Sequence, residues 1–483
     1  MAKNNRQPRI YITRELLLQL ALLAVCLVLP ALLVTDIGIL PFAIIGAVIA
    51  GIIILKRPFI GLVFYLIIFY IRPQEIWFTG VVGLEKAVGI AMLILTILKL
   101  KFTDNFQFKI TNIHVGLVIF IFIALINVAM SFWITGSWKL WVELIRLLIV
   151  FFCVVHLIDT ERQFKFFIMF TILGTAFHAT TAVINYYRGI RELEMGIERA
   201  FAMDSSFSDP NSLAATIVYT LPLIYYYFHK KAPNYIKIFL SVISLISLWC
   251  VVLTGSRTGM AGVLVFLILV LWEGKHKLRN LLLMALAILV IWAVMPSQYQ
   301  QRFESITNLN TEDDVTGAAA SAESRLKFLG YAFGMFMDRP LFGYGLGNFG
   351  TAMGMVYQGA WLQAHTLPGQ LISEMGLTGV IAFSLWMIFL FSNIKKLRHY
   401  FRLSGNTFMS NMTIAMKTHI LLMFFMGLGG HNLFRYNWFI ISAVLVLLLK
   451  PGISGFGLPV QDRNALPGTD LDKESTTETK PVE

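Results

Sequence analysis

Residues 365–393 read HTLPGQLISEMGLTGVIAFSLWMIFLFSN, so a histidine stands at the edge of an apolar segment. A bilayer-spanning helix needs about 20 such residues. Comparable apolar runs recur between residues 15 and 450. The 483-residue chain is 57% hydrophobic and 14% charged, with a mean hydropathy of +0.73, and a soluble domain of this composition would expose large apolar patches. The pattern predicts an all-α, polytopic integral membrane protein.

The apolar runs predict about fourteen membrane spans, or about twelve if the shortest runs merge or are re-entrant. The expected ranges are 15–35, 38–55, 58–71, 80–99, 112–131, 138–158, 164–187, 211–228, 235–254, 258–273, 280–295, 367–393, 415–430 and 437–450. The first run has no small-residue cleavage site and another span follows at once, which favours a retained helix over a signal peptide.

The lysines and arginines lie mostly in every second loop between these spans. Basic loops remain on the cytoplasmic side of a membrane, so we expect both termini to be cytoplasmic. This rule accounts for the net charge of +12 better than nucleic-acid binding does. Cys26, Cys153 and Cys250 all fall inside apolar runs, which indicates neither a disulfide framework nor a zinc site.

The loops divide the chain into six predicted regions. They are N-terminal helices over 1–187, an outer loop over 188–210, central helices over 211–295, a large outer loop over 296–366, C-terminal helices over 367–450, and a polar, disordered tail over 451–483. A long loop in a compact membrane protein is usually functional. Within it, SAESRLKFLGYAFGMFMDRP (321–340) has apolar residues at helical spacing, which predicts an amphipathic helix on or near the outer membrane surface.

Ionisable residues gather on the predicted outer face. They are Arg72 and Glu75, Glu85 and Lys86, Glu143 and Arg146, Arg199, Arg257, Arg325, His365, Glu374 and the stretch HNLFRYN (431–437). Each such group costs roughly 2.5–3.5 kcal/mol at membrane depth, so these groups tend to mark function. A pore or proton relay would distribute them across the full depth. Their concentration on one face favours a site at the outer leaflet, where a lipid-linked substrate meets water.

Several of these residues also have a purely structural interpretation. Arginines near helix ends, such as Arg72 and Arg257, commonly extend to the interface. Glu143 and Arg146 are three residues apart, which favours an ion pair between helical turns. DPNS (209–212) is a good helix start by itself. His365 alone is compatible with an interfacial, hydrogen-bonding histidine.

One motif is misleading. GLGNFG (345–350) matches the GxGxxG pattern, but a dinucleotide site needs a strand before it and a helix after it. Here the motif follows Pro340 in a membrane-protein loop. We interpret it as a flexible, glycine-rich turn that returns the loop to the membrane.

The opening stretch resembles the signature of the O-antigen ligase superfamily, in which a histidine precedes a glycine by eleven positions and a second glycine follows three later. His365, Gly376 and Gly379 occupy these positions. The family usually has Asn, Ser or Gln after the histidine. This chain has Thr366, which keeps a hydroxyl able to make a serine-like hydrogen bond.

Three further motifs resemble the family in the same order, over about residues 198–380. ERAFAMDSSFSDPNSLA (198–214) contains an arginine and a Pro-Asn helix start with Asn211, TGSRTG (254–259) contains Ser256 and Arg257, and RPLFGYGLGNF (339–349) is the glycine-rich lead-in. KRPFIGLVFYLIIFYIRPQEIW (56–77) resembles the branch of exosortase-associated O-glycosylation ligases.

The resemblance implies a GT-C-like glycosyltransferase of the bacterial inner membrane. Such enzymes transfer a glycan from undecaprenyl diphosphate to an acceptor on the periplasmic side and require no metal or other cofactor. The acceptor is lipid A–core in lipopolysaccharide ligases, a protein hydroxyl in some relatives, and the growing glycan in the polymerases of polysaccharide biosynthesis. EDD (312–314) is the nearest acidic cluster, and we interpret it as a solvated loop.

The predicted chemistry needs cations for the diphosphate and a base for the acceptor. Arginine binds phosphate oxygens bidentately and stays charged, so Arg199 and Arg257 are the expected diphosphate clamp, with Arg325 as a third member. A neutral His365 would take the proton of the attacking hydroxyl. Attack opposite the diphosphate would invert the anomeric centre.

Three alternatives remain open. A polymerase of the same superfamily needs the same clamp and outer loop. A transporter of lipid-linked oligosaccharide would usually show internal repeats and a site at the bilayer midplane, and the sequence indicates neither. A structural scaffold would be indifferent to loss of His365.

Overall fold

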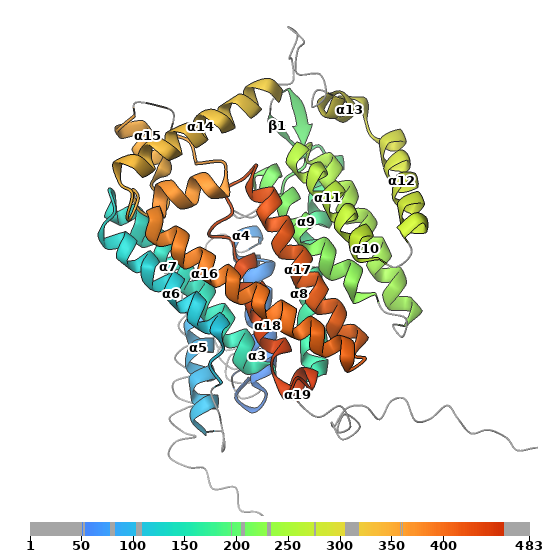
Figure 1. Ribbon diagram of the computed structural model, residues 1–483. Helices are drawn as coiled ribbons and strands as arrows, with labels where there is room; N and C mark the ends of the chain where they lie inside the picture. Colours follow the sequence, from blue (N-terminus) through green and yellow to red (C-terminus); the bar gives the residue numbers. More distant parts are fainter. Residues whose placement is uncertain are drawn as a thin grey trace, which may run out of the picture. The chain divides into compact units, whose positions relative to one another are not determined.

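The computed structural model describes residues 51, 54–77, 83–102, 109–194, 196–203, 208–228, 233–274, 277–304, 318–357, 359 and 361–457. Helices dominate these residues (Figure 1), and the strands are β1 (Glu192–Glu194) and β2 (Ile197–Arg199), which form a short antiparallel hairpin. The predicted all-α class is confirmed.

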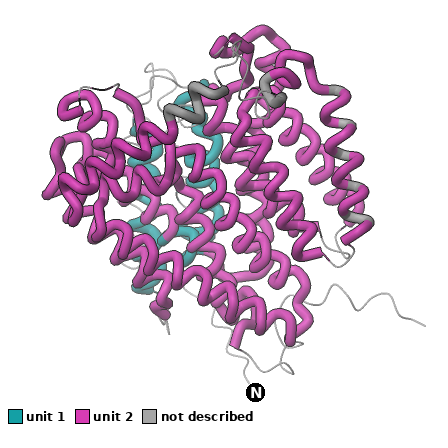
Figure 2. Tube along the Cα trace, turned by 45° about the horizontal axis from the view of Figure 1, so that its top comes forward, with its two compact units in different colours: residues 1–108, 152–157 teal, residues 109–151, 158–483 magenta. Residues whose placement is uncertain are grey.

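The chain forms two compact units, coloured separately in Figure 2. The first contains residues 1–108 and 152–157, and the second contains residues 109–151 and 158–483. The described helices of the first unit are α3 (Pro58–Tyr70), α4 (Pro73–Ile76) and α5 (Leu84–Phe102). Helix α7 (Ile134–Leu157) contributes residues to both units.

The remaining helices belong to the second unit. The long ones are α6 (Asn112–Ala129), α8 (Glu161–Tyr187), α9 (Pro210–Tyr227), α10 (Asn234–Leu253), α11 (Arg257–Glu273), α12 (Lys277–Val294), α14 (Ala318–Asp338), α16 (Leu367–Leu403), α17 (Thr407–Gly427) and α18 (Asn437–Leu448). The short ones are α13 (Ser297–Glu304), α15 (Phe349–Met355) and α19 (Pro451–Ser454).

Among the described residues, 7 helices are long and apolar enough to cross a membrane. They are Pro58–Ile76, Asn112–Ala129, Ile134–Leu157, Glu161–Tyr187, Asn234–Leu253, Leu367–Leu403 and Thr407–Gly427. Each span predicted from residue 58 onward contains a helix, but several of these helices are shorter or less apolar. The predicted span 15–35 and most of 38–55 lie outside the described residues. Of the predicted tail, residues 451–457 contain α19 with buried Ile453, and residues 458–483 are not described.

In the first unit, α3 and α5 pack closely through glycine. A Cβ atom at Gly89 would lie 2.8 Å from the Tyr65 hydroxyl. At the end of α3, Arg72 has a φ of 52° and its guanidinium bonds Glu75 at 2.9 Å, three residues on. The predicted pair Glu143 and Arg146, on the part of α7 in the second unit, also forms an ion pair along one helix. Both pairs fit the structural interpretation.

Helix α16 is interrupted at Gly376, whose φ of 60° and ψ of -158° are not helical. The preceding loop pairs with the backbone groups at the interruption: Tyr344 N donates to Ser373 O (2.8 Å), Gly345 N to Glu374 O (2.9 Å), Leu377 N to Pro340 O (2.8 Å) and Thr378 N to Leu341 O (3.1 Å). The loop around GLGNFG is therefore fixed by hydrogen bonds rather than being the flexible turn that we expected.

Helices α9, α11 and α17 also pack closely, because α11 presents glycines to its neighbours. A Cβ atom at Gly259 would lie 2.8 Å from Ala214 on α9, and one at Gly262 would lie 2.5 Å from Met426 on α17. At the other end of α11, Glu273 bonds Arg398 of α16 and Lys417 of α17, each at 2.6 Å. These contacts hold α11 against α9 and α17 near its start and against α16 and α17 at its end.

The predicted amphipathic segment forms α14, but its apolar side chains divide between two faces. Phe328 packs inward against Phe349, with ring centroids 6.3 Å apart. Leu326 and Phe333 are exposed, at 72% and 57%. The exposed face fits a helix at a membrane surface.

Candidate functional site

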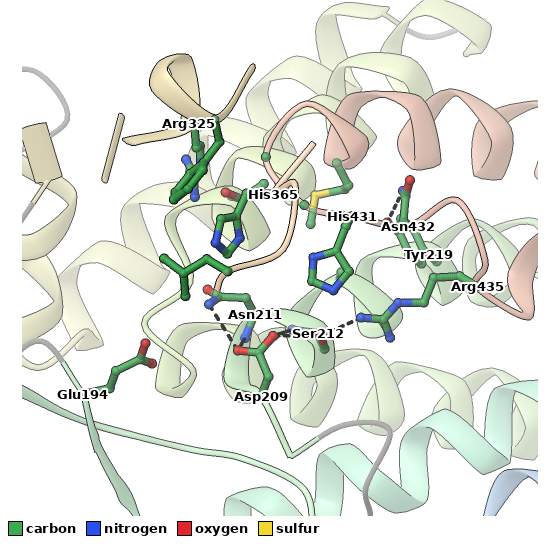
Figure 3. Close-up of a pocket in the computed structure, with 17 residues that line it drawn as sticks. Glu194, Asp209, Asn211, Ser212, Tyr219, Arg325, His365, His431, Asn432 and Arg435 are labelled. Carbon is green, nitrogen blue, oxygen red and sulfur yellow. Dashed lines mark hydrogen bonds between the residues drawn. The ribbon is translucent and has the colours of Figure 1, made fainter. Parts of the chain in front are cut away.

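A cavity of about 730 Å³ lies in the second unit where six segments meet. Its walls come from the β1 hairpin, the first turns of α9 and α11, helix α14, the loop before α16 and the loop between α17 and α18. Segments more than 200 residues apart in the chain thus supply one site. Figure 3 shows its polar side chains directed towards one another.

The structure places some of the predicted site residues together at this cavity. His365, Arg325 and Asn211 line the cavity, and Thr258 lines it directly after Arg257. Arg199, Ser256 and Thr366 lie in the surrounding framework, where they hold the lining segments in place.

His365 has an unusual backbone conformation for a side chain with a Cβ atom. Its φ of 53° lies in the left-handed region, which costs about 1–3 kcal/mol for a non-glycine residue. Its ring packs 5.4 Å from Phe328 and 6.2 Å from His431, measured between centroids. Such outliers cluster at active sites, where the surrounding structure maintains the strain. The observed strain therefore supports a functional role for His365.

The surroundings of His365 favour its neutral form. Burial lowers the pKa of its imidazole, the nearby Arg325 lowers it further, and Asp209 acts in the opposite direction with a smaller effect. The net pKa lies below the ordinary value of about 6.5. A neutral imidazole can accept a proton, as a general base must.

Arg325 points into the cavity from α14 (Figure 3). Burial lowers the pKa of its guanidinium, but arginine starts so high that it stays charged. None of the salt bridges between described residues includes it. An unpaired cation beside a cavity is a suitable partner for an anionic substrate group.

Arg199 is placed differently from the expectation of a clamp facing the substrate. Its side chain is 1% exposed, and its Nε donates to Thr254 O at 2.6 Å. Its Nη2 donates to Asn211 Oδ1 at 2.8 Å, and its Nη1 pairs with Glu194. These contacts join the hairpin, the end of α10 and the start of α9. Arg199 would have to release them to bind a diphosphate directly.

Two of the motif residues, Ser256 and Thr366, are helix caps in the structure. Ser256 Oγ accepts from Gly259 N at 3.2 Å and begins α11. Thr366 Oγ1 accepts from Gly369 N at 3.1 Å and begins α16, so the hydroxyl of the unusual threonine is used. Such caps are each worth about 1 kcal/mol.

The motif glycines act through the backbone. A Cβ atom at Gly376 would lie 2.7 Å from the Leu341 carbonyl, and one at Gly379 would lie 2.1 Å from the Met375 side chain. Gly376 also has the positive φ that glycine adopts without strain. Both glycines therefore allow the interrupted start of α16 to form just after His365.

Six further lining residues were not among the predicted site residues: Asp209, Ser212, Tyr219, His431, Asn432 and Arg435. Asp209 caps α9 by accepting from Asn211 N (3.2 Å) and Ser212 N (2.9 Å). Burial opposes its ionisation, but the hydrogen bonds from Ser212 and Asn211 outweigh burial and lower its pKa. Asp209 is thus an ionised structural anchor and a weak base.

The loop between α17 and α18 contributes the rest of these six residues, apart from Tyr219 on α9. Burial, with a smaller effect from Arg435, lowers the pKa of His431 to about 4, so its ring is also neutral. Asn432 Nδ2 donates to Tyr219 Oη at 2.9 Å. The polar cluster HNLFRYN was the sequence signal for this loop, but its partners on α9 could not be read from the chain.

The structure offers no suitable place for a metal ion among the residues it describes, since no three His, Cys, Asp or Glu side chains are grouped for one. The acidic stretch 312–314 lies outside those residues. The polar groups that line the cavity are imidazoles, guanidiniums, hydroxyls, amides and the carboxylates of Glu194 and Asp209.

Residues 242–384 match the model of a family described as O-Antigen ligase. The matched region runs from α10 into α16 and includes Arg257, Arg325 and His365. No curated protein matches the chain. The predicted relationship to the superfamily is confirmed, whereas the exosortase-associated branch stays a prediction.

Proposed function

From the premise that this multi-pass membrane protein belongs to the O-antigen ligase superfamily, we propose that it is a membrane glycosyltransferase. It transfers a glycan from undecaprenyl diphosphate to an acceptor hydroxyl at the periplasmic face of the bacterial inner membrane. The observation that carries this proposal is the cavity in which a strained, neutral His365 stands beside Arg325, a cation that forms no salt bridge with another described residue.

The proposed reaction is a single displacement. The acceptor oxygen forms a bond to the anomeric carbon, while the bond from that carbon to the diphosphate oxygen breaks and its electron pair leaves with the diphosphate. His365 takes the hydroxyl proton. General-base help of this kind is worth roughly 10²–10⁴-fold. Because attack and departure occur on opposite sides of the carbon, the anomeric centre is inverted.

The diphosphate requires compensating positive charge, and fixed cations commonly supply the largest catalytic effect. Of the three predicted arginines, Arg325 lines the cavity. Arg257 is adjacent to the lining residue Thr258, and we retain it as a proposed phosphate ligand. The buried contacts of Arg199 favour a supporting role instead, in which it holds Asn211 at the cavity.

Two of the predicted regions, the loops over 188–210 and 296–366, contain residues that line the cavity. In the proposed enzyme, these two loops form the catalytic face. A polymerase of the same superfamily would use the same bond chemistry and differ only in the acceptor. The acceptor class therefore decides between ligase and polymerase.

The test uses the full chain in proteoliposomes with an undecaprenyl-diphosphate-linked oligosaccharide. Reactions contain either no acceptor or lipid A–core, and products are separated by size. One glycan joined to lipid A–core, with release of undecaprenyl diphosphate, is the expected result. A ladder of longer glycans without added acceptor would replace the ligase proposal with a polymerase. Movement of the lipid-linked donor across the bilayer without bond formation would contradict both.

A further inference from the structure

The cavity contains two pairs of imidazole and guanidinium groups. Arg325 lies beside His365, whereas His431 and Arg435 lie across from them (Figure 3). The electrostatic effects follow the same pairing, because Arg325 lowers the pKa of His365 and Arg435 lowers that of His431. The two rings, with centroids 6.2 Å apart, face each other in between. The first pair belongs to the proposed reaction, and the second pair has no role in it yet.

Arg435 is held in a defined orientation by neutral and indirect contacts. Its Nη2 donates to Ser212 Oγ at 2.5 Å, and Ser212 Oγ donates to Asp209 Oδ2 at 2.8 Å. Asp209 is itself fixed by the first turn of α9. Ser212 is uncharged, and no salt bridge between described residues includes Arg435. The guanidinium therefore keeps its charge at the cavity with part of its donor fork available.

The ring of His431 adds a second unused group on this side. Its Nδ1 is buried and has no hydrogen-bond partner in the described structure. A buried polar atom without a partner costs free energy, which a ligand in the cavity would recover.

The geometry of an inverting displacement separates the base from the leaving group. The base lies about 3 Å from the attacking oxygen, and that oxygen approaches within about 3–3.5 Å of the anomeric carbon. The departing oxygen lies beyond the carbon, on the far side from the base. A diphosphate beside Arg325 would be on the same side as His365, whereas one beside Arg435 would be opposite.

We infer that Arg435, oriented by Ser212 and Asp209, binds the departing diphosphate, with His431 beside it, while Arg325 acts on the acceptor side with His365. This inference rests on the proposed function. No extra proton is needed, because the diphosphate leaves with the bonding electron pair and the fixed guanidinium compensates its charge.

The test measures binding of undecaprenyl diphosphate and of undecaprenyl phosphate to the full-length protein in detergent micelles. The variants are Arg435→Gln, Arg325→Gln and, as a matched control at the far end of α16, Arg402→Gln, whose side chain is exposed. A hydrogen bond to a charged group corresponds to roughly tenfold to hundredfold in affinity. We expect Arg435→Gln to weaken diphosphate binding by that factor, Arg325→Gln to weaken it less, and Arg402→Gln to remain within about threefold of the parent.

The outcomes separate this inference from the proposed function. If the parent protein binds no polyprenyl diphosphate, the proposed function fails. If the parent binds it and Arg435→Gln binds equally well, or if Arg325→Gln has the larger effect, only the assignment to Arg435 is overturned. Should Arg435→Gln fail to fold, Ser212→Ala replaces it, since Asp209 still caps α9. About fivefold weaker binding is then expected from the released guanidinium, and unchanged binding overturns the inference.

Discussion

Charged groups lie near both ends of helix α11, and the two ends are built differently. At one end, Glu273 is shared by Arg398 and Lys417, so charges of both signs are in direct contact. At the other end, Arg325 and Arg435 line a cavity and contact no carboxylate among the described residues. The first arrangement stabilises the fold, and its charges are already paired with one another, so they are not available to a ligand. The second leaves positive charge in place for a substrate.

The largest expected effect on glycan transfer comes from comparing two histidines at opposite ends of α16. His365 stands at the start of α16, and His399 is exposed near its end. We expect His365→Ala to lower glycan transfer by roughly 10²–10⁴-fold, since it removes the base, and His399→Ala to leave transfer unchanged. Transfer from undecaprenyl-diphosphate glycan is measured at matched amounts of folded protein. Equal activity of the two variants would make His365 a packing residue.

The pH dependence of glycan transfer tests whether His365 and Arg325 act at the same end of the molecule. His365 works as a base only when neutral, and its pKa is lowered. Activity is therefore kept below pH 6.5 and lost as the pH falls through the lowered pKa, by about tenfold per unit beyond it. Removing the nearby positive charge with Arg325→Gln should raise this pKa and move the acid limb to higher pH.

The matched control for that profile is Arg398→Gln, at the opposite end. Because Arg398 is far from His365 along α16, the acid limb of its kcat/KM profile should coincide with that of the parent. A limb near pH 6.5 in the parent, or one unmoved by Arg325→Gln, would contradict the assignment of His365 as the titrating base.

The ion cluster should matter for stability instead. Glu273→Gln leaves Arg398 and Lys417 without their shared carboxylate, in a position where the Glu273 side chain is 12% exposed. We expect a loss of about 1–3 kcal/mol in the free energy of unfolding, between the values for exposed and buried pairs. Thermal unfolding in detergent measures this loss. Activity per folded molecule should stay the same, and a selective loss of activity would contradict the division between the two ends.

The smallest effect concerns the cap beside His365. Thr366→Val removes the oxygen that accepts from Gly369 N and should cost about 1 kcal/mol of stability, whereas Thr366→Ser keeps the bond. The two variants are compared by thermal unfolding under identical conditions. Equal stability would show that this cap contributes little to the start of α16.

The sequence predicted the helices well because burial in lipid imposes long apolar runs. It was less accurate where polar or charged residues intervene. Helix α17 begins at Thr407 rather than at 415, since the polar residues of its first two turns, TFMSNMTI (407–414), delay the start of the apolar pattern. Helix α16 continues to Leu403, past the predicted end at 393. A helix extends beyond its apolar part at no cost in backbone hydrogen bonds.

The site was predictable only where one segment carries its own signal. His365 was found from a local motif, and the structure places it at the cavity. The bond from Arg435 to Ser212 joins residues 223 positions apart, which no local pattern encodes. The buried contacts of Arg199 depend in the same way on Glu194 and Thr254 from other elements. The chain revealed which charges are present, and only the fold separated compensated charges from available ones.

The interruption of α16 at Gly376 has a consequence for how the protein is made. An unpaired backbone amide or carbonyl in hydrocarbon costs several kcal/mol, so α16 alone would enter the bilayer as a continuous helix. The interruption becomes favourable only when Tyr344, Gly345 and their neighbours supply the replacement hydrogen bonds. The loop that precedes α16 must therefore be in place first. During biosynthesis the bent form of this helix, and with it the placement of His365, is a late event that follows membrane insertion.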